Sequence, residues 1–300
     1  YDVDEALNRY LDYLVSCYTG TDKLNDLTVV VDCANGAAYK AGPRLWSRLG
    51  ARVIAINNNP NGININDRCG STYTEGLRSA VVHFKADVGI AYDGDADRCI
   101  VVDEFGNETD GDHLMVICAL DLRRRGLLDP PKVVATVMSN IGLDIALRRE
   151  SVQVENCKVG DRYVLEKMKE TGAILGGEQS GHVIFLQHST TGDGLLTSLK
   201  LVEVMKRTGL PLSDLAREME KLPQMLVNIK LEDKETILSH ELVNAALGRA
   251  EKKLGEMGKL VVRPSGTEPL VRIMAQGPRQ YLLEEVIAEI TDAIKQAQEQ

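Results

Sequence analysis

Three aspartates stand at alternating positions near residue 95 of the 300-residue chain, and an arginine follows them at once. They are Asp93, Asp95 and Asp97, separated by two small residues, and the arginine is Arg98. Apolar runs flank the motif on both sides, so two strands are expected to meet at a tight loop. Carboxylates this close repel each other, and a positive charge is expected among them. Because hard divalent cations take oxygen ligands, the pattern predicts a Mg²⁺ or Ca²⁺ site.

A calcium loop of the EF-hand type is the main competing interpretation of this motif. Counted from Asp93, positions 1, 3 and 5 are aspartates and position 12 is Glu104, as in such a loop. Position 6, however, should be glycine for the sharp turn and is Arg98 here, and the flanks are typical of strands. We therefore reject the calcium loop. A solvated acidic turn stays open as an alternative.

The stretch Gly176–His182 is a glycine-rich turn with polar side chains at close spacing. Glu178 and Ser180 supply the acceptors and the donor that sugar hydroxyls need, and His182 adds an imidazole. The alternative is an ordinary tight turn with a surface glutamate and a structural histidine. From these residues alone the two interpretations are equally good.

Lys158 lies in the segment Lys158–Arg162, between a predicted strand and a predicted helix. A lysine in such a loop is usually a solvated residue. It gains interest only if the fold brings it near the other motifs.

A third polar loop lies between two prolines near residue 266 and is predicted to form a rigid anion cradle. Hydroxyl groups, two guanidinium groups and backbone amides freed by glycine suit a phosphate dianion. The candidate residues are Arg263, Ser265, Gly266, Thr267 and Arg272.

Composition excludes several classes of function. The chain carries 35 basic and 44 acidic residues and a net charge of −9, which argues against nucleic acid as its main partner. No apolar run approaches the roughly 20 residues that cross a bilayer, so no membrane partner is expected. The six cysteines are scattered without a C-x-x-C pair, as expected for reduced thiols of a cytoplasmic protein. The first residue, Tyr1, is not a natural initiator, so the true N-terminus is expected to lie further upstream.

The predicted elements alternate between strand and helix, which implies parallel strands joined by right-handed crossovers. The ligand site of such a sheet lies beyond the carboxyl ends of its strands, where Asp93 stands. We predict an α/β fold with two mixed-sheet α/β domains and a smaller α+β domain at the C-terminus. The predicted domains are 1–104 with the aspartate loop, 105–218 with the sugar loop and 219–300 with the phosphate cradle. Within them we predict a short strand over 173–175, a linker between Pro211 and Pro223, and one helix over 238–254.

Taken together, the three motifs resemble those of the α-D-phosphohexomutases. The motifs are Asp-Gly-Asp-Ala-Asp-Arg (93–98), Gly-Glu-Gln-Ser-Gly-His (177–182) and Arg-Pro-Ser-Gly-Thr-Glu-Pro (263–269). With the stretches 136–140 and 158–162, the second motif looks most like that of the bacterial phosphoglucosamine mutases. The resemblance covers the whole chain, but it matches only domains two, three and four of that family. The Thr-Ala-Ser-His-Asn-Pro type of motif, with the phosphoserine of the first domain, is not found in the sequence.

The resemblance implies a role for each candidate residue. Asp93, Asp95 and Asp97 would bind Mg²⁺, and Arg98 would steady the phosphoryl group in transfer. Glu178 and Ser180 would hold sugar hydroxyls, and Lys158 and His182 would handle protons or contact phosphate. The phosphate that does not react would be held by Arg263, Ser265, Gly266, Thr267 and Arg272.

The implied reaction converts glucosamine 6-phosphate to glucosamine 1-phosphate through a phosphoserine enzyme and a 1,6-bisphosphate. Its product feeds UDP-N-acetylglucosamine and cell-wall synthesis. A hexosamine phosphate is the expected partner, a homodimer is compatible with the sequence, and the 300 residues alone are expected to be inactive. Two alternatives stay open: a phosphomannomutase or phosphoglucomutase, and a sugar-phosphate binding module without turnover.

Overall fold

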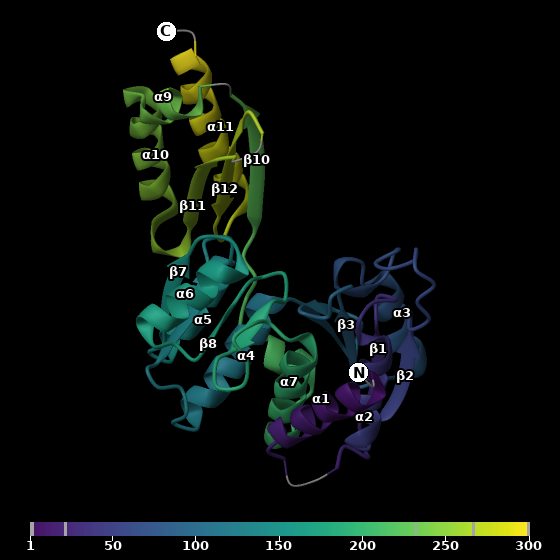
Figure 1. Ribbon diagram of the computed structural model, residues 1–300. Helices are drawn as coiled ribbons and strands as arrows, with labels where there is room; N and C mark the ends of the chain where they lie inside the picture. The colour runs from purple at the N-terminus through teal and green to yellow at the C-terminus, as the bar shows by residue number, and fades with distance from the viewer. Residues whose placement is uncertain (1–2, 21–22, 232, 266–267, 299–300) are drawn as a thin grey trace. The chain divides into compact units, whose positions relative to one another are not determined.

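The computed structural model describes residues 3–20, 23–231, 233–265 and 268–298. The chain divides into two compact units. Unit 1 comprises Tyr1–Ser139 and Ala146–Met219, and unit 2 comprises Asn140–Ile145 and Glu220–Gln300. Among the described residues, unit 1 contains two sheets and unit 2 contains one (Figure 1).

The first sheet of unit 1 is mixed and five-stranded. Its strands are β1 (Thr28–Asp32), β2 (Arg52–Ile56), β3 (Val88–Tyr92), β4 (Cys99–Asp103) and β5 (Glu108–Thr109), and its helices are α1 (Val3–Cys17), α2 (Ala38–Arg48), η1 (Gly70–Thr72) and α3 (Glu75–Phe84). The order is β2-β1-β3-β4-β5, parallel through β3 and antiparallel beyond it. Because β3 and β4 are buried along their whole length, their apolar runs form the core below the aspartate loop.

The second sheet of unit 1 repeats this plan with four strands. The elements are α4 (Gly111–Arg124), β6 (Lys132–Thr136), α5 (Ile141–Arg149), β7 (Gln153–Cys157), α6 (Asp161–Thr171), β8 (Leu175–Gly177), β9 (Val183–Phe185), α7 (Gly194–Thr208) and α8 (Leu212–Ala216). One of the helices between the strands, α5, has its first five residues in unit 2. The order is β7-β6-β8-β9, with β6 parallel to both neighbours and β9 antiparallel. In both sheets, therefore, a polar loop begins at the carboxyl end of a buried strand. The first loop joins β3 to β4, and the second joins β8 to β9.

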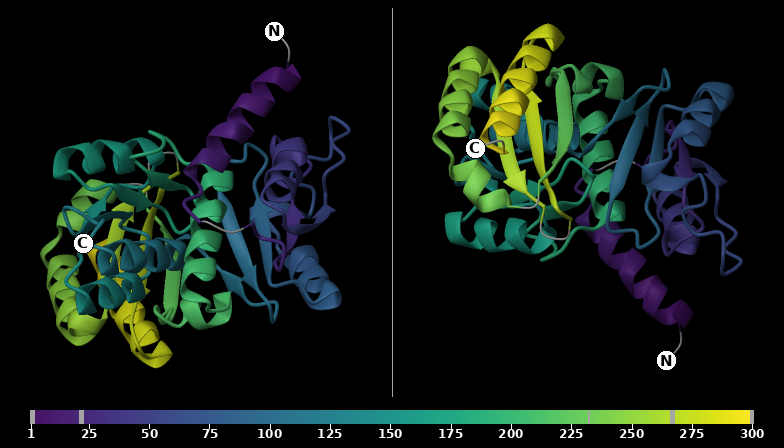
Figure 2. Two further views of the ribbon diagram at one scale, coloured as in Figure 1. Left: turned by 90° about the horizontal axis from the view of Figure 1, so that it is seen from below. Right: turned by 90° about the horizontal axis from the view of Figure 1, so that it is seen from above.

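Unit 2 is a three-stranded antiparallel sheet covered by helices. Its elements are β10 (Gln224–Lys230), α9 (Lys234–Ser239), α10 (Glu241–Leu254), η2 (Gly255–Met257), β11 (Lys259–Pro264), β12 (Leu270–Gln276) and α11 (Gln280–Gln298), with strand order β10-β12-β11. The helices α10 and α11 lie side by side against the sheet (Figures 1 and 2). Alternate residues of β12, namely Val271, Ile273 and Ala275, are buried with both helices in one core.

The predicted fold class is confirmed, since two mixed α/β sheets precede a smaller antiparallel one. The boundaries of the three predicted domains stay a prediction. All six cysteines are free thiols, and five of them are buried. In the described part of the chain, no helix combines the length and apolar character needed to span a bilayer.

The short strand predicted over 173–175 is displaced by two residues, because β8 contains the two glycines of the glycine-rich motif. A Cβ atom on Gly176 would lie 2.9 Å from the Met168 sulfur, and one on Gly177 would lie 2.5 Å from the carbonyl oxygen of His182. The strand therefore needs glycine for close packing. Sequence reasoning assigned these glycines to a turn.

The helix predicted over 238–254 is two helices, α9 and α10. His240 has an extended backbone between them (φ −64°, ψ 141°), and its Nδ1 accepts a hydrogen bond from the Leu242 amide at 3.3 Å. The residue thus ends one helix and caps the next. The predicted linker between Pro211 and Pro223 is also partly helical, because α8 buries Leu212 and Leu215.

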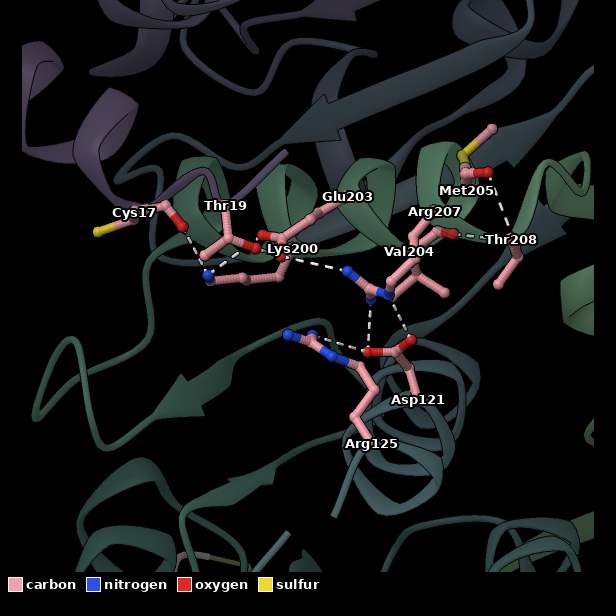
Figure 3. A network of polar contacts seen from close by, with 10 residues as sticks. All are labelled: Cys17, Thr19, Asp121, Arg125, Lys200, Glu203, Val204, Met205, Arg207 and Thr208. Carbon is pink, nitrogen blue, oxygen red and sulfur yellow. Dashed lines mark hydrogen bonds and ion pairs between the residues drawn. The ribbon is translucent and has the colours of Figure 1, made fainter. Parts of the chain in front are cut away.

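A charged network in unit 1 connects the segment after α1 with α4 and α7 (Figure 3). Glu203 accepts hydrogen bonds from Thr19, Lys200 and Arg207, and Arg207 also pairs with Asp121 at 2.5 Å. The Glu203 side chain is only 5% exposed. Burial would raise its pKa, but the hydrogen bonds and cations outweigh burial, so the pKa of Glu203 lies below its ordinary value.

We expect Glu203→Gln to lower the free energy of unfolding by about 2 kcal/mol at pH 7, because it removes a buried carboxylate that accepts hydrogen bonds from Thr19, Lys200 and Arg207. Since the folded pKa is depressed, the charged Glu203 stabilises the fold above pH 4.5, and this contribution disappears as the pH falls below that value. The wild-type advantage over Glu203→Gln should therefore shrink in acid. Urea unfolding from pH 3 to 7 measures it.

The matched control is Glu166→Gln, which removes an exposed pair with Arg162 on α6. Exposed pairs contribute about 0.5 kcal/mol or less, so this variant should unfold like the wild type. Equal losses for the two variants would contradict the importance of the buried network.

Candidate functional site

The aspartate loop joins β3 to β4 and is fixed by its own backbone and by the turn after β1. The Ala96 amide donates to the Asp93 carbonyl at 3.1 Å, and the Ala37 amide donates to the Gly94 carbonyl at 2.8 Å. The Arg98 amide donates to Asp93 Oδ1 at 3.2 Å. Ala96 takes a left-handed conformation (φ 62°), which a non-glycine residue adopts only when its surroundings impose it.

Residues that follow β8 and β9 also hold the aspartate loop. The Cys99 amide donates to the Gly181 carbonyl at 3.0 Å, and the Gly194 amide donates to the Ala96 carbonyl at 2.9 Å. The predicted metal loop and the predicted sugar loop are therefore joined directly within unit 1.

Two of the three aspartates lie together. The pKa of Asp93 is raised to about 6, first by burial and then by the neighbouring Asp97 carboxylate. Burial acts in the same direction on Asp97, but hydrogen bonds from Asp93 and from His182 lower its pKa below the ordinary value. The opposite shifts of the two pKa values show that the two carboxylates interact directly.

The third aspartate, Asp95, is exposed on the same loop and makes no hydrogen bond or ion pair within the part of the chain that the structure describes. Accordingly, no group of three or more His, Cys, Asp or Glu side chains in the described ranges is arranged to hold a metal. Mg²⁺ does not require such a group, since one or two carboxylates with water and phosphate oxygens suffice. The oxygen-only donors and the excess negative charge of Asp93 and Asp97 fit Mg²⁺.

Arg98 contributes a buried donor beside the two carboxylates. Its Nε atom is buried and has no acceptor among the described residues. A buried guanidinium donor without a partner is costly, so the position favours an added anion. This observation connects the aspartate loop with an anionic ligand.

Two side chains of the sugar loop bind neighbouring segments, the turn before α6 and the residue before α4. Glu178 Oε1 accepts a hydrogen bond from the Gly160 amide at 2.9 Å, which ties this loop to the turn before α6. Gln179 Nε2 donates to Asp110 Oδ2 at 3.4 Å. Ser180 is exposed. Glu178 therefore keeps one carboxylate oxygen for other partners, and the Ser180 hydroxyl faces solvent.

Lys158 is brought to this loop through the same turn, since it precedes Gly160 by two residues. Its side chain is exposed, and Nζ lies 5.9 Å from the centre of the Tyr163 ring. The fold thus brings Lys158 close to the segment that contains Glu178, and the exposed lysine side chain can contact a ligand.

Sequence reasoning missed Asp32, which ends β1 and is fully buried. Its carboxylate accepts from the Ala34 amide at 2.9 Å, from Asn57 Nδ2 at 3.0 Å and from the Gly70 amide at 3.0 Å. Burial raises the pKa of Asp32, and these hydrogen bonds act against it. The residue fixes three loops at the end of the sheet that carries Asp93. In the sequence, this role is indicated by an aspartate that directly follows an apolar run.

In unit 2, Arg263 of β11 stands directly opposite Arg272 of β12. Like charges opposite each other on a sheet repel, and among the described residues the pair has one carboxylate partner, Glu268 at 3.1 Å from Arg272. Arg272 Nε is buried without an acceptor among the described residues. The pair is therefore suited to bind an anion.

The loop that follows β11 has a support that sequence reasoning missed. Lys234 Nζ donates to the carbonyl of Ser265 at 2.7 Å and to that of Glu268 at 3.1 Å. Ser265 is buried and its hydroxyl accepts from the Glu268 amide at 3.3 Å. The candidates Gly266 and Thr267 lie outside the described residues.

The candidate residues thus form two sets. The unit 1 set comprises Asp93, Asp95, Asp97, Arg98, Lys158, Glu178, Ser180 and His182, and the unit 2 set comprises Arg263, Ser265 and Arg272. Within unit 1, a side-chain contact joins the sugar loop to the aspartate loop, from His182 Nδ1 to Asp97 Oδ2 at 3.0 Å.

Gly181→Ala should separate the two loops of unit 1. Gly181 has a φ of +92°, and a Cβ atom there would lie 2.2 Å from the Cys99 carbonyl oxygen, so the backbone must move. We expect a loss of about 3 kcal/mol in the free energy of unfolding, the sum of backbone strain and overpacking. Urea unfolding measures it.

Gly126→Ala is the matched control, because Gly126 also has a positive φ (+68°) but open space around its Cα. It should cost only about 1 kcal/mol, the strain of the left-handed conformation. If both variants lost equal stability, close packing at Gly181 would be refuted.

Comparisons with known proteins agree with this arrangement. Three models of the phosphoglucomutase/phosphomannomutase family match the chain: α/β/α domain II at residues 8–106, α/β/α domain III at 110–222, and the C-terminal domain at 226–293.

Curated relatives share much of the sequence. The phosphoglucosamine mutase of Syntrophomonas wolfei is 74% identical over 298 residues, which are 99% of this chain and 66% of that protein. The phosphoglucosamine mutase of Pelotomaculum thermopropionicum is 52% identical over 294 residues, which are 98% of this chain and 66% of that protein. The chain thus spans slightly less than two thirds of the length of these relatives.

Solved structures share the fold. A phosphoglucomutase/phosphomannomutase family protein of Burkholderia thailandensis is 24% identical with a TM-score of 0.79, covering 97% of this chain and 64% of its own. Aspergillus fumigatus N-acetylphosphoglucosamine mutase, solved with GlcNAc-6P and magnesium, is 19% identical with a TM-score of 0.74, covering 95% of this chain and 69% of its own. The three matched family domains and the shared fold lead to one conclusion: the chain belongs to the phosphoglucomutase/phosphomannomutase family, the α-D-phosphohexomutases.

Proposed function

We propose that this chain is the part of a phosphoglucosamine mutase that holds the metal, the sugar and the distal phosphate. The complete enzyme interconverts glucosamine 6-phosphate and glucosamine 1-phosphate through a phosphoserine and a 1,6-bisphosphate. The 74% identity to the Syntrophomonas wolfei phosphoglucosamine mutase carries this proposal. Two arginine donors, Arg98 Nε and Arg272 Nε, are buried without an acceptor in the described part of the chain and support it, because a bisphosphate presents two dianions.

The aspartate loop is the reacting end of the proposed site. Asp93, Asp95 and Asp97 would hold Mg²⁺, which neutralises charge on the transferring phosphoryl group when bound. Arg98 Nε would donate to a phosphoryl oxygen and so acquire the acceptor that it lacks in the free chain. Phosphoryl transfer depends mainly on positioning and charge neutralisation. Backbone hydrogen bonds from both sheets of unit 1 fix the conformation of this loop and so would position its side chains.

The sugar loop would bind the hexose of the substrate. The exposed Ser180 hydroxyl and the second Glu178 oxygen would bind sugar hydroxyls, which need both a donor and an acceptor. Lys158, exposed beside the same loop, is placed to contact phosphate or to exchange a proton with a hydroxyl. The intermediate must turn end over end, so this loop would have to accept the sugar in both orientations of the bisphosphate.

The cradle of unit 2 binds the phosphate that does not react. Arg263 and Arg272 supply guanidinium donors, and the loop with Ser265, Gly266 and Thr267 supplies hydroxyl and backbone donors. A dianion between the arginines relieves their repulsion, so this end of the substrate contributes binding without taking part in bond cleavage.

The experiment compares glucosamine, glucose and mannose 6-phosphates as substrates of the full-length protein. We expect the highest kcat/KM for glucosamine 6-phosphate, and a loss of activity with EDTA that Mg²⁺ restores. The 300 residues alone, tested in parallel, should show no turnover. A preference for mannose 6-phosphate would favour a phosphomannomutase. Turnover by the 300 residues would show that they need no other phosphoryl carrier.

Lys234→Ala should weaken substrate binding about tenfold, because it removes two charge-assisted hydrogen bonds that hold the cradle loop. We expect KM to rise while kcat changes little, since the cradle binds the distal phosphate equally in ground and transition states. Steady-state kinetics of the full-length enzyme measure both constants.

Lys252→Ala is the matched control. Lys252 is exposed in the last turn of α10 and makes no ion pair within the described residues. It removes the same charge from unit 2, so unchanged KM is expected. A similar rise in KM for Lys252→Ala would indicate an effect of net charge and contradict the role of Lys234 in the loop.

A further inference from the structure

His182 is held rigidly at the junction of the two loops of unit 1. It directly precedes β9 and is 2% exposed. A Cβ atom added to Gly192 would lie 2.6 Å from both Cε1 and Nε2 of the imidazole, so the Gly192 backbone packs directly on the ring. The ring therefore has no room to turn toward a ligand.

The hydrogen bonds of the ring specify which nitrogen carries the proton. The Gly192 amide donates to His182 Nε2 at 3.0 Å, and an amide N–H can only donate. Nε2 is therefore the unprotonated acceptor, and the single proton of the neutral imidazole lies on Nδ1. Nδ1 faces Asp97 Oδ2 at 3.0 Å, where a carboxylate oxygen accepts.

We propose that His182 is a positioning residue that orients the Asp97 carboxylate, and that it does not exchange protons with the substrate. This inference rests on the proposed function, in which Asp97 is a metal ligand. Both ring nitrogens already have partners inside unit 1, so neither offers a lone pair or a proton to a sugar hydroxyl. The role differs from the proton handling that the family resemblance implies for His182.

The position of His182 explains why an imidazole is needed there. One side of the ring fixes Asp97, and the other fixes Gly192, which lies two residues before the first residue of α7, Gly194. The Gly194 amide in turn donates to the Ala96 carbonyl of the aspartate loop. His182 thus joins the aspartate loop and the segment before α7 by two hydrogen bonds. A residue that orients a metal ligand affects how tightly the metal binds, even though it does not touch the metal itself.

The test compares His182→Asn, His182→Gln and His182→Ala in the full-length enzyme. The Asn amide nitrogen occupies the place of Nδ1, so His182→Asn keeps the donor to Asp97 and should retain kcat within about tenfold of the wild type. His182→Gln moves the amide to the place of Nε2, and His182→Ala removes both bonds. Both should raise the Mg²⁺ concentration for half-maximal activity about tenfold or more.

A loss of 10²-fold or more in kcat for His182→Asn, equal to that of His182→Ala and without a change in Mg²⁺ requirement, would overturn the proposal. That pattern is expected of a general acid or base.

The tautomer is the second readout, and it requires neither substrate nor activity. Long-range ¹H–¹⁵N spectra of histidine-labelled full-length protein, with His182→Asn to assign the signal, should show the proton on Nδ1. A proton on Nε2 would overturn the proposal. If the wild type lacks mutase activity, the proposed function fails, while the tautomer still tests the hydrogen bonds of His182.

Discussion

The repulsion between Asp93 and Asp97 is the constraint on which unit 1 depends. Their carboxylates are half-buried and close enough that the Asp97 carboxylate contributes to the raised pKa of Asp93. Backbone hydrogen bonds from the turn after β1, from Gly181 and from Gly194 hold it closed. Segments from both sheets of unit 1 thus fix the conformation of one short loop.

Both units use the same physical device: charged groups are brought together without full compensation, and rigid backbone holds them there. In unit 1 these groups are two neighbouring carboxylates and Arg98, whose Nε has no acceptor within the described ranges. In unit 2 they are two arginines in register on neighbouring strands. Sites of this kind are preorganised, because folding has already brought the charged groups together and ligand binding needs no further rearrangement of them.

The order of elements and the three polar loops could be predicted from the sequence, because apolar runs and loop chemistry are local properties. The contact of His182 with Asp97 could not, since it joins residues 85 positions apart through the packing of two sheets. The role of Lys234 was hidden for a similar reason: a lysine that donates to two carbonyls looks like any surface lysine in sequence. Glycines in β8 were misassigned because their need for close packing is a tertiary property.

The register of Arg263 with Arg272 has a consequence for the folding of unit 2. Two like charges on adjacent strands destabilise the folded sheet relative to the unfolded chain, where they lie far apart. An anion bound between them reverses the sign of this contribution and adds RT ln(1 + [L]/Kd) to the free energy of unfolding. Under the proposed function, phosphate esters would stabilise this unit, and its thermal stability would report on how much ligand surrounds it.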